Sequence, residues 1–356
     1  MNASFLYIML MMKKILSVLC LLLMLTACSK KPYTSVKTNS IVWYDYFDTV
    51  CQIVAYDNDD SQKFDSLMAE AEKLTEYYYR LFDIYHSYQG LNNLYTINKA
   101  KGEAVEVDRE MIDFLKYCED VSELVGDKFN VMLGPVLKIW HDFREAVENE
   151  EDYHIPDYES LSAAYEHCQM ESLVIDEENQ TVRLSDSAAS LDVGGIAKGY
   201  AAQKVADYLA SADPEGTYLL SFGGNVICIN EKRDGTAWKI ALTDPDNTNE
   251  TFIKVNPQSK SVVTSGNYQR YVEVDGVRYH HVIDTTTLFP STYWSSVSVI
   301  GEDSGLCDAL STTLFTMSLE DGKKLLSAIA GYEALWLDNG HNLYCTDGFK
   351  EYIINE

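Results

Sequence analysis

Apolar residues recur every three or four positions in several stretches of the chain, which is the spacing of an amphipathic helix. The first stretch contains Phe64, Leu67, Met68, Ala71, Leu74, Tyr78 and Leu81. The second contains Met111, Leu115, Cys118, Val121 and Leu124, and the third Ala197, Ala201, Val205 and Leu209. We expect two more helices over 308–317 and 320–329. Each apolar stripe is expected to face a protein core.

Short apolar or alternating runs between these helices predict strands. We assign strands to residues 218–221, 238–243, 261–264, 269–274 and 277–283, and a terminal strand pair to 334–337 and 352–354. Asp275-Gly276 between two of these runs is a strong hairpin signal. The pattern predicts a mixed α/β fold with substantial antiparallel sheet flanked by helices. Neither a repeat nor a Pro/Gly-rich linker interrupts residues 42–356, so we expect a single large domain there.

The N-terminus follows the pattern of a lipoprotein signal peptide. Two lysines precede an apolar run over 15–25, which ends in Leu25-Thr26-Ala27-Cys28. The run is short for a bilayer span, and the small residues before Cys28 fit a cleavage site that leaves this cysteine as the lipidated N-terminus. We assign 1–27 to the signal peptide and 28–41 to the lipidated cysteine and a flexible tether. An ordinary signal peptide or a poor membrane anchor is the alternative.

The formal net charge of −27 becomes −29 when the two lysines of the signal peptide are removed. So acidic a surface repels phosphate backbones, which excludes nucleic acid as an expected partner. We therefore expect membrane contact only through the lipid on Cys28, with acyl chains such as palmitate holding the protein in the cell envelope, facing the periplasm or the exterior. An anionic ligand would need a local site with its own cation.

The cysteines beyond Cys28 stand singly, without any C-x-x-C spacing. This pattern does not support a zinc site or thioredoxin-like chemistry. A chain of this length buries a large core and does not need disulfides to fold. We therefore expect buried free thiols at Cys51, Cys118, Cys168, Cys228, Cys307 and Cys345.

The segment from Leu191 to Tyr200, LDVGGIAKGY, ends an apolar run, turns through two glycines and enters a helix. Glycines let a backbone approach a phosphate, the N–H groups of a first helical turn point at it, and Lys198 adds a positive charge. The spacing matches neither G-x-G-x-x-G nor the P-loop. The segment is therefore a candidate anion site, and a tight turn with a solvated lysine is the alternative.

Asp308 and Thr312 stand four residues apart on an expected helix, so their oxygens lie on one face and can converge on a hard cation such as Mg²⁺. The alternative is that Asp308 caps the helix. Ser265, within Thr264-Ser265-Gly266-Asn267-Tyr268, supplies a hydroxyl to a small polar pocket. The adjacent His280 and His281 are expected on opposite faces of a strand, one toward a pocket and one toward solvent. A histidine beside a phosphate ester suits proton transfer, and a structural histidine is the alternative.

In this order the motifs resemble those of the FAD:protein FMN transferases, also called ApbE or flavin-trafficking lipoproteins. The resemblance covers nearly all of residues 42–356 and implies an ApbE-like, T-fold-related domain. The matching segments are Phe47-Asp48-Thr49, Leu94 to Asn98, Gly126 to Val131, Gly134-Pro135-Val136 with Trp140, Asp192 to Tyr200, Phe222 to Asn225, Trp238 with Asp244-Pro245, Thr264 to Tyr268, His281 to Asp284, and Asp308 to Thr312. The chain differs from the family pattern at Asp48 (Gly in the family), Asn130 (Asp), Thr285 (Pro) and Leu288 (Gly).

The resemblance implies Mg²⁺-dependent cleavage of FAD and transfer of FMN to a Thr or Ser hydroxyl of an exported acceptor protein in a flavin-dependent redox system, with release of AMP. It places the metal on Asp308, Thr312 and the carbonyl of Gly195, with Ser311 nearby. His281 and Asp308 are the implied catalytic residues. The residues implied for FAD binding are Phe47, Tyr85, Lys128, Phe129, Asn130, Asp192, Lys198 and Val282. We add Ser265, the serine of the small polar pocket, to this set.

Two other functions remain open at this point. A metal-dependent FAD pyrophosphatase would use water where the transferase uses a protein hydroxyl, and the motifs do not separate the two. A lipoprotein that binds flavin without catalysis would not need Asp308 and Thr312, both of which are present.

Overall fold

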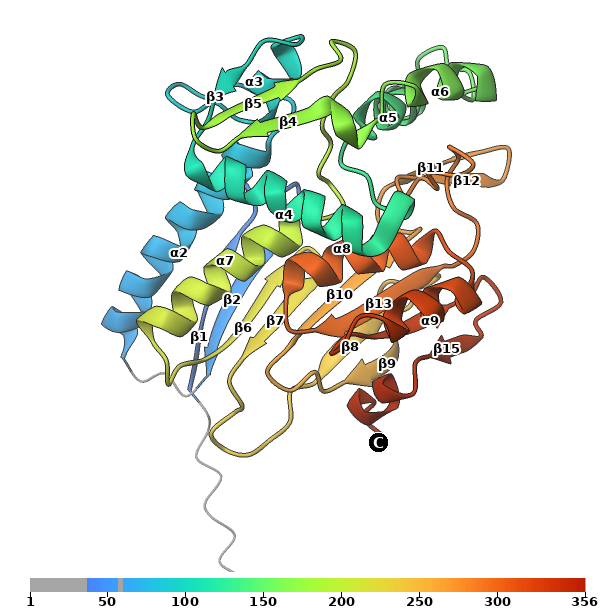
Figure 1. The fold of residues 1–356 in the computed structure, drawn as a ribbon. Helices are drawn as coiled ribbons and strands as arrows, with labels where there is room; N and C mark the ends of the chain where they lie inside the picture. Colours follow the sequence, from blue (N-terminus) through green and yellow to red (C-terminus); the bar gives the residue numbers. More distant parts are fainter. Residues whose placement is uncertain (1–36, 57–59, 356) are drawn as a thin grey trace, which may run out of the picture. The chain divides into compact units, whose positions relative to one another are not determined.

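The computed structural model describes residues 37–56 and 60–355 (Figure 1), and Thr38–Glu356 form one compact unit. The signal peptide, Cys28 and most of the tether lie outside the described residues. Among the described residues no helix is both long and apolar enough to cross a membrane. The free thiols are as expected, since the five cysteines from Cys51 to Cys307 are buried and unpaired, and Cys345 is unpaired and half-buried.

One eight-stranded sheet forms the centre of the domain, and each neighbouring pair in it is antiparallel. Its order is β1 (Thr38–Trp43), β2 (Cys51–Tyr56), β6 (Thr217–Phe222), β7 (Asn225–Ile229), β10 (Ser261–Gly266), β13 (Ser296–Gly301), β14 (Glu333–Leu337) and β15 (Leu343–Cys345). Three smaller sheets join β3 (Val105–Glu106) with β5 (Thr181–Leu184) and β4 (Leu173–Asp176), β8 (Ile240–Thr243) with β9 (Thr251–Val255), and β11 (Tyr271–Val274) with β12 (Val277–His280). The predicted mixed α/β fold with a large antiparallel sheet is confirmed.

Helices cover one face of the main sheet, where α7 and α8 lie side by side and α4 crosses above them (Figure 1). The α-helices are α2 (Ser61–Phe82), α3 (Leu94–Lys99), α4 (Arg109–Val125), α5 (Gly134–Glu148), α6 (Tyr158–Tyr165), α7 (Ala197–Ala212), α8 (Ser304–Phe315) and α9 (Leu319–Ser327). Short 3₁₀ turns are η1 (Gly126–Lys128), η2 (Met170–Ser172) and η3 (Gly348–Tyr352). Because α8 packs against both α7 and strand β10, a side chain on α8 can meet groups from the helix layer and from the sheet.

The predicted apolar stripes are largely buried. The four positions predicted for α7 are all buried, whereas Leu124 at the end of α4 is 45% exposed. Val125 is buried in its place, because the position four residues after Val121 stays on the core-facing side of the helix. The apolar stripe predicted for α4 is therefore correct at every position except the last, Leu124.

Other strand predictions need correction. Residues 352–354 do not form a strand, because β14 pairs with β15 and the chain then turns through η3. Strand β1 begins at Thr38, inside the stretch assigned to the tether, since Thr38 to Ile41 pair with β2. Strand β12 ends at His280, so His281 lies beyond the ladder. Strand β13 has no counterpart in the prediction, because Ser296 and Ser298 interrupt its apolar run although both are buried.

Candidate functional site

The backbones of α7 and α8 nearly touch at Gly199. A Cβ added there would lie 2.3 Å from the carbonyl oxygen of Ser304 and 2.7 Å from Cβ of Asp308. Only glycine permits this approach, and it lets the Gly199 N–H in the first turn of α7 donate to Asp308 Oδ2 at 2.9 Å. The sequence predicted that the N–H groups of this first helical turn bind an anionic ligand. One of them, the Gly199 N–H, binds the Asp308 carboxylate of the protein itself instead.

Asp308 is buried and fixed in orientation. Its Oδ2 also accepts a hydrogen bond from Asn225 Nδ2 at 3.2 Å, and its side chain is 5% exposed. The helix cap is Asp303, whose carboxylate accepts from the Leu306 N–H at 2.8 Å. Asp308 is thus not the cap of α8, and its buried carboxylate calls for another partner.

Hydroxyl and backbone groups surround Asp308 on the same side of α8. Ser265 Oγ on β10 lies 2.7 Å from Ser311 Oγ and 3.4 Å from Thr312 Oγ1. A Cβ added at Gly195 would lie 3.4 Å from Thr312 Oγ1, so the glycine turn passes directly beside this hydroxyl. Ser311 is already engaged, because its Oγ also donates to the Asp308 carbonyl at 2.9 Å. We call Gly195, Ser265, Asp308, Ser311 and Thr312 the oxygen cluster.

The donor set of the oxygen cluster fits Mg²⁺. All its side-chain donors are hard oxygens, and Thr312 is partly exposed, so a ligand can reach it. Within residues 37–56 and 60–355 no group of three His, Cys, Asp or Glu side chains gathers as a metal site. A cluster with one carboxylate suits a cation that keeps waters and binds substrate phosphate oxygens, and it does not suit zinc.

A second polar group lies around Asp192, beside the glycine turn. Asp192 Oδ1 accepts from the Gly194 N–H at 2.9 Å, and Lys198 Nζ donates to the Gly194 carbonyl at 3.3 Å. Burial raises the pKa of Asp192, while the Gly194 N–H and then the nearby cations of His141, Arg144 and Arg270 oppose that shift. We call Arg144, Lys198, Arg270 and His281 the cationic rim.

His281 is half-buried within the cationic rim. Burial, followed by the charges of Lys198, His280, Arg270 and Arg144, lowers its pKa to about 3. Its backbone N–H donates to the Arg270 carbonyl at 3.1 Å, and its Nδ1 is buried without a hydrogen-bond partner among the described residues. The ring is neutral at pH 7, and its buried Nδ1 keeps an unused hydrogen-bonding capacity.

His280 has a structural role. Its Nε2 lies 2.8 Å from the Ser291 carbonyl, and its Nδ1 accepts from the Val282 N–H at 3.2 Å. Burial lowers the pKa of His280 to about 4. The expectation that one of the two histidines faces solvent is wrong, because the chain bends after β12 and keeps both rings at least half-buried.

Phe47 and Tyr85 border the cationic rim. The Phe47 carbonyl accepts from Arg270 Nη2 at 3.5 Å, and the exposed Tyr85 ring lies 5.6 Å from the ring of His141. Phe47 and Asp48 have φ values of +56° and +50°. Leu288, another position where the family pattern has glycine, has φ +63°. The backbone thus keeps a glycine-like conformation at Asp48 and Leu288, at the expense of some strain.

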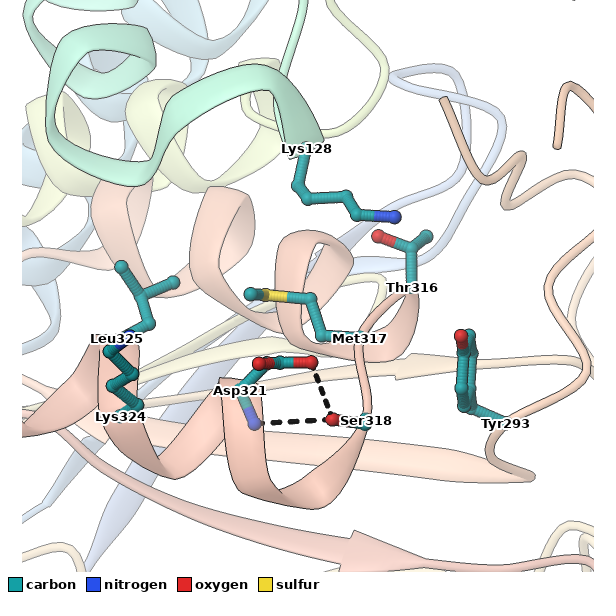
Figure 2. A pocket seen from close by; sticks show the side chains of 8 residues that line it. All are labelled: Lys128, Tyr293, Thr316, Met317, Ser318, Asp321, Lys324 and Leu325. Atoms are coloured by element: carbon teal, nitrogen blue, oxygen red, sulfur yellow. Dashed lines mark hydrogen bonds between the residues drawn. The ribbon is translucent and has the colours of Figure 1, made fainter. Parts of the chain in front are cut away.

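The side chains of the remaining candidates make their contacts within the fold. Lys128 Nζ contacts Asp284 Oδ1 at 2.6 Å and Thr286 Oγ1 at 2.7 Å. Figure 2 shows Lys128 above an open pocket of about 420 Å³, lined also by Tyr293, Thr316, Met317, Ser318, Asp321, Lys324 and Leu325. Phe129 and Val282 are buried in the core. The Asn130 amide joins the Cys168 carbonyl (2.7 Å) to the Met132 N–H (2.7 Å), so it stabilises a loop.

Sequence reasoning gave no role to Asn225, Gly199, Arg144 or Arg270. Asn225 follows Gly223-Gly224 in a quoted motif, and Gly199 follows Lys198, so the segments were noticed without their function. Arg270 directly precedes strand β11 and Arg144 lies on the unassigned helix α5. Only the packing of these elements brings the two arginines to one place.

Comparisons with known proteins match the chain over most of its length. The ApbE family model matches residues 47–336. FAD:protein FMN transferase of Treponema pallidum is 34% identical over 261 residues, which cover 68% of this chain and 70% of that protein. The Vibrio cholerae protein of the same name is 29% identical over 293 residues, covering 81% and 85%. The crystal structure of the ApbE protein from Thermotoga maritima superposes with a TM-score of 0.78 and 27% identity, covering 90% of this chain and 100% of that one. The chain belongs to the ApbE family.

Proposed function

We propose that this protein transfers FMN from FAD to a Thr or Ser hydroxyl of an exported acceptor protein, with Mg²⁺ held by the oxygen cluster and a lipid anchor on Cys28. As an ApbE family member similar to FAD:protein FMN transferases over most of its length, the chain is a flavin transferase. The acceptor is a protein of a flavin-dependent redox system. Its hydroxyl oxygen forms a bond to the phosphorus of the FMN half, the bond to the bridging oxygen breaks, and AMP leaves.

One observation carries the assignment of the site. The buried Asp308 carboxylate is held by the Gly199 N–H and Asn225, and it stands one helical turn from Thr312, which faces Gly195 and Ser265. Asp308, Thr312 and the Gly195 carbonyl are the residues that would hold Mg²⁺. When bound, the metal would neutralise charge on the diphosphate oxygens, the Lewis-acid contribution that phosphoryl transfer needs.

The cationic rim would act on the same diphosphate. Lys198, at the start of α7, adds a positive charge beside the glycine turn. The neutral ring of His281 accepts the proton of the acceptor hydroxyl. A pKa of about 3 makes His281 a weak base by itself, and burial first and then the cations Lys198, Arg270 and Arg144 cause that low value. A bound diphosphate opposes these cations, so substrate binding moves the pKa of His281 toward the range useful for catalysis.

The lipid anchor is proposed from the sequence of the N-terminus, the lysine pair followed by an apolar run and Leu25-Thr26-Ala27-Cys28. It would keep a highly acidic protein at a membrane that its surface charge repels. A Cys28→Ala variant expressed with the full leader should lose labelling by a palmitate analogue and leave the membrane fraction. Retention of both properties would refute the anchor.

The transfer reaction is tested with the chain from Ser29 onward, FAD, Mg²⁺ and a candidate acceptor. We expect AMP release together with a fluorescent acceptor band in a denaturing gel, and the loss of both when Mg²⁺ is chelated. AMP release without a labelled protein would identify a pyrophosphatase. FAD that is bound and left intact would contradict an enzymatic role.

A further inference from the structure

We propose that Arg144 on α5 binds an oxyanion of a substrate, either a phosphate group of FAD or a carboxylate of the acceptor protein. The inference rests on the proposed function, since it assigns Arg144 to the same site. It adds a substrate-binding residue that neither the sequence motifs nor the oxygen cluster supplied.

Packing places Arg144 firmly. The buried face of α5 includes Trp140, whose ring stacks on Tyr279 of β12 at 5.9 Å and whose Nε1–H donates to the Leu288 carbonyl at 2.8 Å. Phe143 packs against the same Tyr279 at 5.4 Å. Figure 1 shows α5 above the β11–β12 hairpin, whose last strand leads directly to His281. Arg144 is thus carried on a helix fixed to the segment that holds the candidate base.

The other end of α5 is tied to Asp192. Leu133, at the start of the helix, forms a parallel bridge with Ser190, and the Asp192 N–H donates to the Val131 carbonyl at 2.8 Å. The helix is therefore packed both on the segment that leads into the glycine turn and on the hairpin. The charges of Asp192 and Arg270 both act on Arg144.

Arg144 differs from other arginines in its hydrogen bonding. Its Nη1 is buried without a partner among the residues that the structure describes. By contrast, Arg109 pairs with Asp113 and Glu177, and Arg278 donates to Asn267. Leaving a charged donor buried and unpaired destabilises the folded protein. Such a cost is expected where the donor is reserved for a ligand.

Arg144 and Arg270 together form a local centre of positive charge. Burial lowers the pKa of Arg144, and the nearby Tyr85, Glu148 and Asp192 only partly oppose this shift, while the cation of Arg270 adds to it. Arg270 and His281 lie on the hairpin side of the same group. In a chain of net charge −27, an incoming oxyanion needs such a local concentration of positive charge. A guanidinium fork matches the geometry of a phosphate or a carboxylate with two parallel hydrogen bonds.

The test compares Arg144→Gln and Arg144→Lys with the matched control Arg109→Gln, which removes the same charge from an exposed ion pair on α4. The KM for FAD, the KM for the acceptor and the affinity for inorganic pyrophosphate are measured separately. We expect Arg144→Gln to raise one KM by about 10- to 100-fold, the worth of hydrogen bonds to a charged group. Arg144→Lys should show a smaller rise, and Arg109→Gln none.

The pattern of the change identifies the source of the oxyanion. A rise in the KM for FAD with an equal loss of pyrophosphate affinity assigns a phosphate of FAD. A rise confined to the KM for the acceptor assigns a carboxylate of that protein. The inference is overturned if Arg144→Gln keeps both KM values and the pyrophosphate affinity within about twofold of the wild type. It is also overturned if the variant lowers only kcat, in step with a fall in Tm that Arg144→Lys shares.

The outcome separates this inference from the proposed function. A wild-type protein that transfers flavin while Arg144→Gln behaves normally refutes only the role of Arg144. A protein that transfers no flavin but binds pyrophosphate in an Arg144-dependent way supports the anion site and contradicts the function. If Arg144→Gln does not fold, Arg144→Lys keeps the charge and the stem, and its KM values decide.

Discussion

The oxygen cluster and the cationic rim both border the glycine turn, and they differ in whether their polar groups have hydrogen-bond partners. In the oxygen cluster, Asp308 and Ser311 are held by hydrogen bonds from within the fold. In the cationic rim, His281 Nδ1 and Arg144 Nη1 are buried without partners in the described part of the chain. The first region is organised before a ligand binds, as a metal site requires, and the second keeps donors and acceptors for a substrate.

Electrostatics separates the two regions further. Burial, and after it the positive charges of the cationic rim, lower the pKa of His281, although the chain as a whole is acidic. The oxygen cluster carries a single carboxylate and neutral donors. This difference predicts that substitutions in the oxygen cluster affect flavin transfer through the metal. Substitutions in the cationic rim are expected to affect it through substrate binding and proton transfer.

The largest effect is expected for Asp308→Asn. The change keeps the shape and the acceptor for the Gly199 N–H but removes the charge that would hold Mg²⁺, which is worth several kcal/mol in the transition state. Flavin transfer should fall about 1000-fold or more in an AMP-release assay. Asp303→Asn is the control and should keep its activity, because the Asp303 carboxylate caps the same helix, accepts from the Tyr117 hydroxyl and is not part of the oxygen cluster. Equal losses of flavin transfer in Asp308→Asn and Asp303→Asn would contradict a specific role of the oxygen cluster.

A neighbouring pair of hydroxyls gives a sharper test. Thr312→Val removes a member of the oxygen cluster and should reduce transfer about 10- to 100-fold. Thr313→Val removes the next hydroxyl along, which is buried and without a hydrogen-bond partner among the described residues, so its loss should be neutral or stabilising. Activity at saturating Mg²⁺ and urea unfolding measure the two effects. Similar activity in both variants would remove Thr312 from the site.

The cationic rim should reveal itself in the dependence of stability on pH. Because the pKa of His281 is lowered to about 3, the unfolded chain takes up its proton more readily than the folded one. Stability is therefore full above about pH 6.5 and falls as the pH drops toward 3. The His281 contribution should cost about 2 kcal/mol between pH 7 and pH 5.

Urea unfolding of the wild type and His281→Gln at both pH values measures this contribution, since the variant should lose less stability at pH 5. His341→Gln is the control, because Asp246 raises the pKa of His341 and its effect has the opposite direction. An unchanged pH dependence in His281→Gln would show that the ring is not held neutral by its surroundings.

The smallest effect is expected for Asn225→Ala. Asn225 would not contact the metal, and its amide only orients Asp308 through the 3.2 Å bond to Oδ2. Loss of such an orienting partner lowers metal affinity about 10-fold. The Mg²⁺ concentration for half-maximal transfer should rise by that factor, with activity restored at high Mg²⁺. A loss that excess Mg²⁺ does not restore would assign Asn225 to a different role.

The sequence predicted local features of this site well. The four-residue spacing of Asp308 and Thr312 was sufficient to place both on one helix face, and the glycine turn before α7 was recognised from its composition. Gly199 shows the limit of such reasoning, because its N–H was expected to face a ligand and instead bonds Asp308, a residue 109 positions away. The local pattern identified the N–H donors of the first turn of α7. Only the packing of α7 on α8 shows which acceptor they bind.

Residues whose role depends on long-range packing were not found. Arg144 comes near Asp192 and Arg270 only because Trp140 anchors α5 on Tyr279 of a hairpin more than a hundred residues later in the chain. Strand β13 was missed for a related reason, since its serines read as polar while the fold buries them. Lys128, Phe129 and Asn130 were placed in the FAD site by resemblance, and their side chains are occupied in the fold by Asp284, the core and Cys168.

The most direct test of the account is calorimetric titration of Mg²⁺ and, separately, of inorganic pyrophosphate into the wild type, Asp308→Asn and Arg144→Gln. The account predicts that Asp308→Asn loses Mg²⁺ binding while Arg144→Gln retains it. If the oxyanion bound by Arg144 is a phosphate of FAD, Arg144→Gln also binds pyrophosphate more weakly. Mg²⁺ binding of wild-type strength in Asp308→Asn would contradict the central claim, because the oxygen cluster would then not be the metal site.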